Sequence, residues 1–410
     1  MTKHSNSARA VILSGGAEIV SVSIAQAFES AGVSYAVISL VKHSLLARAA
    51  GCVSMTDLSD VAGNPERLRC RLLNILTDLH ALVGSRLVVF ATEDGGLRCL
   101  NEFSAEILKI AEFPRARSLR HGGLDKAELF TFLSGTSAAI YMPPTEIVLD
   151  VDAAPGVLER LGNDAIFKPA LKPWNMDLHD MDGSKVVTQA RSDEPIADLL
   201  RRLRKAWPLS QRWVAQARLQ QYEMGERGVW AVRDGGTMAS IEFVERWKYP
   251  VQGGTGCWVE TLEGNSFVPA AVSILDAVDY VGLAEIPFLK TASGDARLLE
   301  INARAWLQVG LAERSGLSPV IKTLHLLSEG PAPAATYKLR PTVWINIERA
   351  VAAAAGGGVG PRIAAFAALM RAMAKYPELA IYSSRVRGVR WRWIGRVLTA
   401  IWNRLRGLHV

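Results

Sequence analysis

Polar side chains near residue 300 have the types and the spacing of a site for charged ligands. The segment 298–304, Leu-Leu-Glu-Ile-Asn-Ala-Arg, predicts a β-strand. Because side chains of a strand alternate between its two faces, Glu300, Asn302 and Arg304 are expected to share one face. A carboxylate, an amide and a guanidinium on one face predict a surface that holds charged groups.

The preceding apolar segment, Tyr280 to Leu289, contributes one further carboxylate, Glu285. With Gly294-Asp295 as a two-residue hairpin loop, antiparallel pairing puts Glu285 on the same face. The expected pairs are Leu289 with Glu300, Pro287 with Asn302, and Glu285 with Arg304. Two carboxylates and an amide oxygen are ligands that Mg²⁺ takes when it also holds phosphates, and a nearby arginine steadies an anion. An exposed polar face of an ordinary hairpin is the alternative.

Glu285, followed by Glu300-Ile-Asn302-Ala-Arg304, resembles the metal-binding end of the ATP-grasp superfamily, which includes biotin carboxylase, carbamoyl-phosphate synthetase and D-alanine ligase. The resemblance implies ATP as the nucleotide and Mg²⁺ (or Mn²⁺) as the metal. It also implies that Glu285, Glu300 and Asn302 hold the metal and that Arg304 assists a phosphorylated intermediate.

Other segments follow in the order typical of this superfamily. Leu124-Asp125-Lys126 opens a helix-like stretch, Pro143-Pro144-Thr145 follows, and the apolar strand 165–169 carries Lys168. The resemblance implies that Lys126 and Lys168 contact the ATP phosphates, whereas either lysine alone is more typical of a solvated surface. The glycine-rich flap of biotin carboxylase has no counterpart after Lys168, so closure through Lys172 or Lys185 is expected.

Two further segments resemble nucleotide- and substrate-binding parts of the same superfamily. The segment 212–219 resembles the hinge strand that binds adenine through its backbone, which implies Gln216 and Leu219 near the base. In the segment 245–256, Gly253 and Gly254 let the backbone pass close to an anion, and Arg246 and Lys248 supply positive charge. The resemblance implies that this segment faces the acyl acceptor, although a Gly-Gly turn between strands needs no ligand.

The N-terminal part predicts a parallel α/β sheet. Strands are expected over 9–14, 33–41 and 86–92, with a helix over 18–31. The turn Ser14-Gly15-Gly16 lacks the full G-x-G-x-x-G spacing of dinucleotide-binding folds, so it is weak evidence for an oxidoreductase. ATP-grasp enzymes carry a domain of this kind, which usually helps to bind the acceptor substrate.

Length and composition agree with an enzyme of several lobes. A chain of 410 residues with 49% hydrophobic content can bury more than one core, and domains of about 100 to 200 residues predict two to four. No apolar run is long enough to span a membrane, and the segment 1–8 is too polar for a signal peptide. The cysteines lack the spacing of zinc or redox motifs, which favours reduced thiols in the cytoplasm.

The positive charge of the chain is concentrated at its C-terminal end. Residues 385–410 contain seven arginines and no acidic residue, which accounts for the whole formal net charge of +7. The rest of the chain is nearly neutral, so no general role in nucleic-acid binding is expected. Apolar residues recur there at helical spacing, with arginines opposite. Such a helix is typical of binding to an anionic membrane surface, here the inner face of the plasma membrane. It is equally typical of packing on its own domain or on the second subunit of a homodimer.

These observations predict an α/β and α+β architecture. A Rossmann-like pre-ATP-grasp domain is expected over 1–120, an ATP-grasp domain over 121–330 with lobes at about 141–225 and 226–330, and a C-terminal extension with the basic helix over 331–410. The predicted function is a cytoplasmic ATP-dependent ligase that joins a small carboxylate to an amine or a thiol through an acyl phosphate. The alternatives are a non-catalytic membrane-associated nucleotide-binding protein and a Rossmann-type oxidoreductase.

Overall fold

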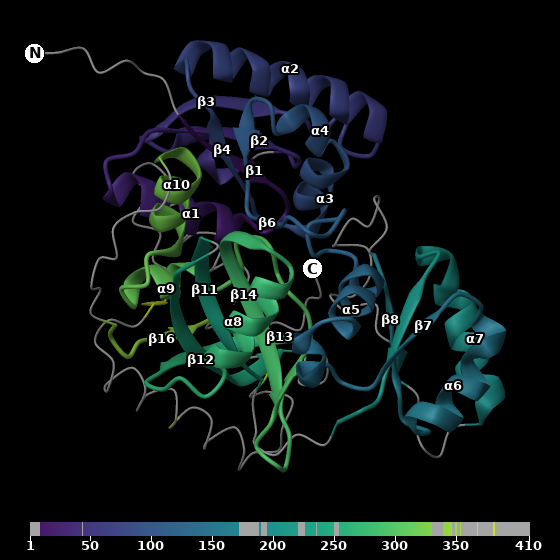
Figure 1. Ribbon diagram of the computed structural model, residues 1–410. Coiled ribbons are helices and arrows are strands. Elements are labelled where there is room, and N and C mark those ends of the chain that lie inside the picture. The colour runs from purple at the N-terminus through teal and green to yellow at the C-terminus, as the bar shows by residue number, and fades with distance from the viewer. Residues whose placement is uncertain are drawn as a thin grey trace, which may run out of the picture.

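The computed structural model describes residues 9–42, 44–171, 195–219, 226–234, 236–249, 254–329 and 339–346, with isolated positions at 188–189, 349–350, 353, 367 and 380–381. In this part of the chain, one parallel sheet and two largely antiparallel sheets are covered by helices (Figure 1). The predicted mixture of α/β and α+β structure is therefore confirmed.

The N-terminal sheet is parallel and has the strand order β3-β2-β1-β4-β5. Its elements are β1 (Ala10–Ser14), α1 (Glu18–Ser30), β2 (Tyr35–Ser39), β3 (Cys52–Asp57), α2 (Pro65–Val83), β4 (Leu87–Ala91), α3 (Asp94–Glu102), α4 (Ser104–Ile107) and β5 (Ala111–Glu112). The central strands are buried throughout, as expected for a parallel sheet with helices on both faces. The strand order reverses between β1 and β4, and the carboxyl ends of such strands form the usual ligand crevice of α/β sheets.

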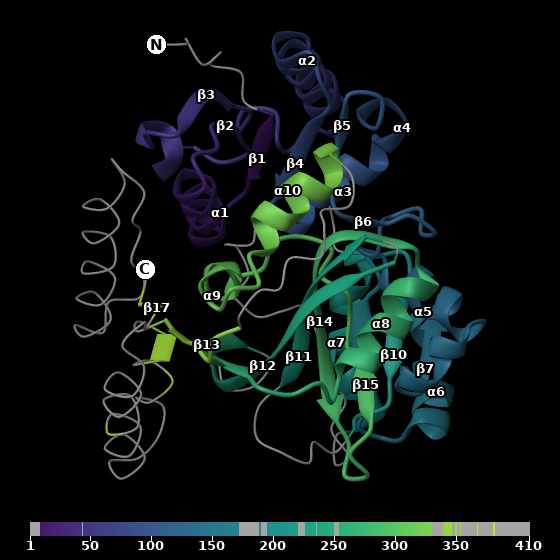
Figure 2. The same ribbon diagram turned by 60° about the vertical axis from the view of Figure 1, so that its left-hand side comes forward.

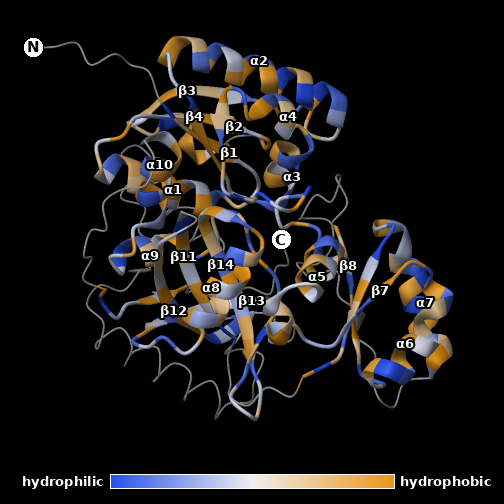
Figure 3. Ribbon diagram, in the orientation of Figure 1, coloured by the Kyte–Doolittle hydropathy of each residue, from blue (hydrophilic) through white to orange (hydrophobic). Residues whose placement is uncertain are grey.

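Helix α2 shows how sequence pattern sets packing in this domain. Its buried residues recur at helical spacing and face the sheet, namely Leu68, Leu72, Leu76 and Leu79. The Asn64 side chain accepts a hydrogen bond from the amide of Arg67 and caps the helix at its start. Gly84 ends it with a φ of 69°. Hydrophobic and hydrophilic residues alternate along this helix (Figure 3).

A small antiparallel sheet follows, with the strand order β7-β10-β8-β9. The elements here are α5 (Lys126–Ser134), β7 (Thr145–Val148), α6 (Ala154–Leu161), β8 (Ile166–Pro169), β9 (Thr188–Gln189), α7 (Ile196–Ala206) and β10 (Trp213–Gln216). Strand β10 is buried on both faces: Trp213 and Ala215 pack in a core with α6 and α7, whereas Val214 belongs to the core of the large sheet. The small sheet therefore presents one face to the rest of the protein.

The large sheet has the order β15-β14-β11-β12-β13-β16-β17, and β6 pairs with β14. Its elements are β6 (Arg115–Ala116), β11 (Arg227–Asp234), β12 (Met238–Tyr249), β13 (Thr255–Leu262), α8 (Val268–Ala277), β14 (Tyr280–Lys290), β15 (Ala296–Leu298), α9 (Val309–Arg314), α10 (Pro319–Glu329), β16 (Val343–Ile345) and β17 (Ala380–Ile381). All neighbouring strands are antiparallel except β16 and β17.

The hairpin of β14 and β15 has a different register from the predicted one. Its loop runs over Thr291–Asp295 and is closed by a 3.0 Å hydrogen bond from the Thr291 amide to the Asp295 carbonyl. Phe288 pairs with Leu298, and Glu285 pairs with Asn302. The predicted two-residue loop is therefore wrong, as are the pairs Leu289–Glu300, Pro287–Asn302 and Glu285–Arg304. One extra residue lies between the two observed pairings on the downstream segment, as in a β-bulge, so strict alternation is lost before Asn302.

Helix α10 joins the N-terminal sheet to the large sheet. It contacts α1 and β4 on one side and β11 and β14 on the other (Figure 2). Phe90 of β4, Trp230 of β11 and Trp306 share one hydrophobic core that crosses this boundary. The segment after Leu298 is therefore held in a fixed position against the ends of β1 and β4.

The C-terminal extension is described only in part. Lys185, Gly253 and the predicted basic helix at 385–410 lie outside the described residues. Among the described residues, no helix combines the length and the apolar character needed to cross a membrane.

Candidate functional site

Glu285 and Asn302 form the centre of the candidate site. The two residues exchange backbone hydrogen bonds of 2.9 and 3.2 Å. The Asn302 side chain also donates from Nδ2 to Glu285 Oε2 at 2.9 Å. Glu285 is 9% exposed, because it lies in the middle of β14 between β11 and the segment after β15. Glu285 and Asn302 are therefore close to each other, as predicted. They are direct register partners, however, whereas the prediction paired Glu285 with Arg304.

Trp230 of β11 is a further partner of Glu285 that the sequence analysis missed. Its indole Nε1 donates to Glu285 Oε1 at 3.0 Å, and its ring stacks on Phe243 and Trp306 with centroid distances of 4.6 and 5.6 Å. Burial raises the pKa of Glu285, and the hydrogen bond from Trp230 works against this shift. Trp230 faces Glu285 because the two are register partners in neighbouring strands, a pairing that local sequence does not reveal.

Lys126 and Glu300 approach the same place from two segments. Lys126 Nζ lies 3.2 Å from Glu300 Oε2. Lys126 begins α5, where the Asp125 side chain caps the helix by accepting from the amide of Glu128 at 3.0 Å. Arg212 donates to the same Asp125 carboxylate at 2.6 Å, so the start of α5 is tied to β10. The structure thus brings together two of the predicted phosphate- and metal-binding residues.

Arg304 completes the cluster at the edge of the N-terminal domain. Its Nε donates to Asp94 Oδ1 at 2.5 Å, and its Nη1 donates to the Ala305 carbonyl at 3.1 Å. Burial opposes the charge of the guanidinium, but Asp94, Glu285 and Glu300 more than offset this, and the pKa of Arg304 is raised. Arg304 is therefore a permanent cation beside the carboxylates.

The donor set fits a metal that also binds phosphates. Among the residues that the structure describes, no three His, Cys, Asp or Glu side chains converge as a metal cage made by protein alone would require. Mg²⁺ usually takes only one or two carboxylates and completes its shell with phosphate oxygens and water. Asn302 donates through its amide nitrogen, so its amide oxygen is the atom suited to a metal. Glu285, Glu300 and Asn302 match that pattern.

Lys168 and Gln216 meet on the face of the small sheet that looks toward the large sheet. Lys168 Nζ donates to Gln216 Oε1 at 3.0 Å, and Gln216 Nε2 donates to Thr145 Oγ1 at 3.2 Å. Gln216 is 3% exposed, and its register partners are Ile166 and Thr145. Side chains of this face alternate with Phe167 and Ala215, which pack against the helices.

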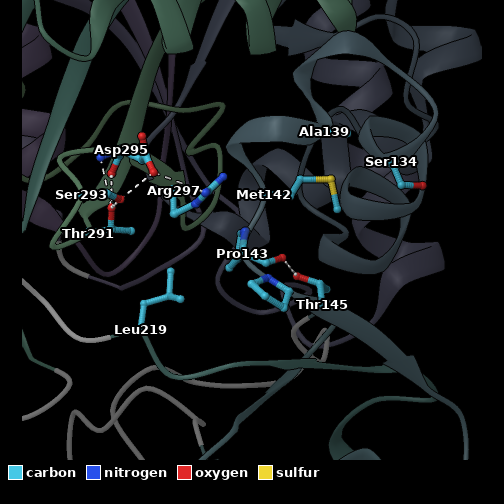
Figure 4. A pocket seen from close by; sticks show the side chains of 11 residues that line it. Ser134, Ala139, Met142, Pro143, Thr145, Leu219, Thr291, Ser293, Asp295 and Arg297 are labelled. Atoms are coloured by element: carbon cyan, nitrogen blue, oxygen red, sulfur yellow. Dashed lines mark hydrogen bonds and ion pairs between the residues drawn. The ribbon is translucent and has the colours of Figure 1, made fainter. Parts of the chain in front are cut away.

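A cavity of about 520 Å³ lies at the end of this face (Figure 4). Met142 and Thr145 line one side, Thr291, Asp295 and Arg297 of the hairpin loop region line the other, and Leu219 lies below Thr291. None of Lys126, Glu285, Glu300, Asn302 and Arg304 lines it. Thr291 lines the cavity and lies six positions after Glu285 on one extended segment. At ~3.3 Å per residue, the cavity is therefore roughly 20 Å from the carboxylate of Glu285.

Arg246 and Lys248 are neutralised by carboxylates. Arg246 Nε donates to Glu260 Oε2 at 3.0 Å, and Lys248 forms ion pairs with Glu226 and Glu245. The positive charge predicted for this segment is therefore paired with carboxylates, two of which, Glu260 and Glu226, come from neighbouring strand segments. Gly254 is buried just before β13.

The glycine turn after β1 is filled by a carboxylate. Glu93, at the end of β4, accepts hydrogen bonds from the backbone of Gly16 and Ala17, and a Cβ on Gly15 would collide with it. Burial raises the pKa of Glu93, and the two amide hydrogen bonds counteract the shift. These amides would otherwise receive a dinucleotide phosphate. The oxidoreductase alternative is thus not favoured.

Several solved structures resemble this chain over 82% of its length. Biotin carboxylase from Campylobacter jejuni, in a complex with β,γ-ATP, has a TM-score of 0.60 and 14% identity, with 74% of its chain covered. Carboxyaminoimidazole ribonucleotide synthase from Aspergillus clavatus, complexed with ATP, has a TM-score of 0.59 and 16% identity, with 81% covered. L-amino acid ligase from Bacillus licheniformis has a TM-score of 0.59 and 13% identity, with 77% covered.

No protein-family model matches the chain, and no curated protein matches its sequence. The structural likeness confirms the predicted fold: the chain has the fold of the ATP-grasp superfamily.

Proposed function

We propose that the protein is an ATP-dependent ligase that joins a small carboxylate to an amine, or to a thiol, through an acyl phosphate. The observation that carries the proposal is the convergence of Lys126, Glu285, Glu300, Asn302 and Arg304 from three separate segments. The ATP complexes among the similar structures support the choice of nucleotide.

The nucleotide lies along the face between the small and large sheets. Its adenosine end occupies the cavity beside Leu219 and contacts the hinge at Gln216, while Lys168 and Lys126 bind the phosphates. Phosphates carry enough charge to require several cations. Lys126 then exchanges its ion pair with Glu300 for a phosphate oxygen, and Lys172 or Lys185 is assigned to closure over the nucleotide.

The chemistry follows from the poor reactivity of a carboxylate. The substrate carboxylate attacks the γ-phosphorus and ADP leaves; the amine then attacks the acyl carbon, loses a proton, and phosphate leaves. Mg²⁺ (or Mn²⁺), when bound, neutralises charge on the phosphates. Glu285, Glu300 and Asn302 would hold it, and Arg304 would stabilise the negative charge of the acyl phosphate. Arg246 and the Gly253-Gly254 segment are assigned to the acceptor substrate.

The organisation proposed for the chain is a pre-ATP-grasp domain over 1–120, an ATP-grasp domain over 121–330 and an extension over 331–410. The basic segment 385–410 binds an anionic membrane surface or packs in a homodimer, and the small-molecule substrates are those of a cytoplasmic enzyme. The arginine-rich, acid-free composition of this segment supports the proposal.

The direct test is Glu300→Gln, assayed by ADP release from Mg-ATP in a screen across amino acids and sugar acids. We expect the variant to keep its circular dichroism spectrum and to lose nearly all turnover, since the amide removes a charged metal ligand. Glu146→Gln is a matched control, because Glu146 is also ion-paired and its side chain is similarly exposed, 27% against 29% for Glu300. Full turnover in folded Glu300→Gln would refute the assignment.

A further inference from the structure

Asp94 reaches Arg304 across a domain boundary, 210 positions along the chain. Asp94 is the first residue of α3 and follows the carboxyl end of β4, where the strand order of the N-terminal sheet reverses. Its Oδ1 accepts from Arg304 Nε at 2.5 Å, within the range of a short charge-assisted hydrogen bond. The N-terminal domain thereby contacts a residue of the proposed reaction centre.

The contact engages one defined edge of the guanidinium. A guanidinium has five N–H donors in a fixed plane. Asp94 engages Nε, and the Ala305 carbonyl engages Nη1. Because the plane is rigid, these two acceptors fix the orientation of Nη2 and of the second Nη1 hydrogen.

The pair is also shielded enough to persist. The side chains of Arg304 and Asp94 are 19% and 23% exposed, so salt screens this ion pair less than a surface pair. The residues directly after Arg304, Ala305 and Trp306, are buried in one core with Phe90 of β4, the strand that precedes Asp94.

We infer that Asp94 is a positioning residue that holds Arg304 with its Nη edge toward the acyl phosphate. This inference rests on the proposed function. It gives the N-terminal domain a part in the reaction besides any contact with the acceptor. An arginine with its Nε partner removed samples other rotamers, and a displacement of about 1 Å at a reacting group costs on the order of 10²-fold in rate.

The experiment uses the full-length chain and acetyl phosphate as a small acyl phosphate probe. Its affinity is measured by calorimetric titration at saturating Mg-ADP, for the parent and for Asp94→Asn, Arg304→Ala and the double variant. We expect each single variant to lose at least tenfold in affinity and the double variant to be no worse than Arg304→Ala. A structural role of Asp94 would persist without Arg304 and would give additive losses, which would overturn the inference.

Asp60→Asn is the matched control, since Asp60 pairs with Arg71 in the same domain, with both carboxylate oxygens 2.7 Å from Nη1. It should leave the affinity unchanged. If Arg304→Ala keeps the parent affinity, the proposed role of Arg304 fails; if only Asp94→Asn keeps it, the inference alone fails. Should Asp94→Asn fail to fold, Asp94→Glu replaces it. The longer side chain shifts the guanidinium, so we expect an intermediate loss of affinity for acetyl phosphate. An affinity equal to that of the parent would overturn the inference.

Discussion

Replacing Trp230 with phenylalanine tests how the buried carboxylate at the site is kept ready for a metal. Phenylalanine preserves an aromatic ring between Phe243 and Trp306, but it removes the indole N–H that donates to Glu285 at 3.0 Å and part of the buried ring volume. Glu285 keeps the hydrogen bond from Asn302. The effect on Glu285 is therefore the loss of one hydrogen bond to a carboxylate whose pKa is already raised by burial.

The magnitude follows from the charge of the acceptor. A hydrogen bond to a charged group contributes about 1.5–3 kcal/mol. Its loss raises the pKa of Glu285 further, because the ionised form loses a donor. Because only the ionised carboxylate binds a divalent cation well, we expect the Mg²⁺ concentration for half-maximal ADP release at neutral pH to rise about tenfold or more. Raising the pH should restore the parent value as Glu285 ionises.

Trp213→Phe is the control for removing a buried indole N–H. Trp213 is likewise fully buried and stacks on Trp207 at 5.3 Å, but its Nε1 donates to main-chain carbonyls at 3.2 and 3.4 Å in the small lobe. Thermal unfolding of both variants monitors any loss of packing. A Mg²⁺ requirement that is unchanged in Trp230→Phe, or that does not fall with rising pH, would refute the reasoning.

Other parts of the molecule allow equally direct tests. Lys168→Ala should weaken binding of a non-hydrolysable ATP analogue by about 1.5–3 kcal/mol in calorimetric titration, through lost charge-assisted contacts; affinity within twofold of the parent would return Lys168 to a structural role beside Gln216. Burial raises the pKa of Glu313 to about 7 from 4.5. Its contribution to stability is therefore present below pH 4.5 and is lost as the pH rises through 7. The loss in the free energy of unfolding is at most about 3 kcal/mol, because the side chain is only half-buried. Glu313→Gln should flatten the free energy of unfolding over this window, and an unchanged pH dependence would contradict the assignment. Deleting residues 385–410 should abolish co-sedimentation with anionic vesicles and leave ADP release intact, whereas loss of folding or of a dimer would identify a packing surface.

The sequence contained the elements of the site but not its exact geometry. Apolar runs ending in glycine or polar residues predicted β1, β2, β4 and the helix α1 to within a few residues. These predictions succeeded because strands covered on both faces appear in the sequence as continuous apolar runs. The hairpin register failed, since loop length depends on the whole turn, here Thr291–Asp295, and a single extra residue changes the pairs. The ion pair of Arg246 was not predicted for a related reason: its partner Glu260 lies on the neighbouring strand.

The ion pairs in the structure reduce the repulsion within this cluster of carboxylates. Lys126 lies beside Glu300, Arg304 lies beside Asp94, and Arg304 also favours the ionised form of Glu285. In the proposed complex, Lys126 turns from Glu300 to a phosphate, which removes one positive charge from beside Glu300 and Glu285. Two such carboxylates raise each other's pKa unless a cation lies between them. When a nucleotide phosphate draws Lys126 away from Glu300, a divalent metal can supply the positive charge that the lysine provided. Binding of the metal and binding of the nucleotide therefore favour each other.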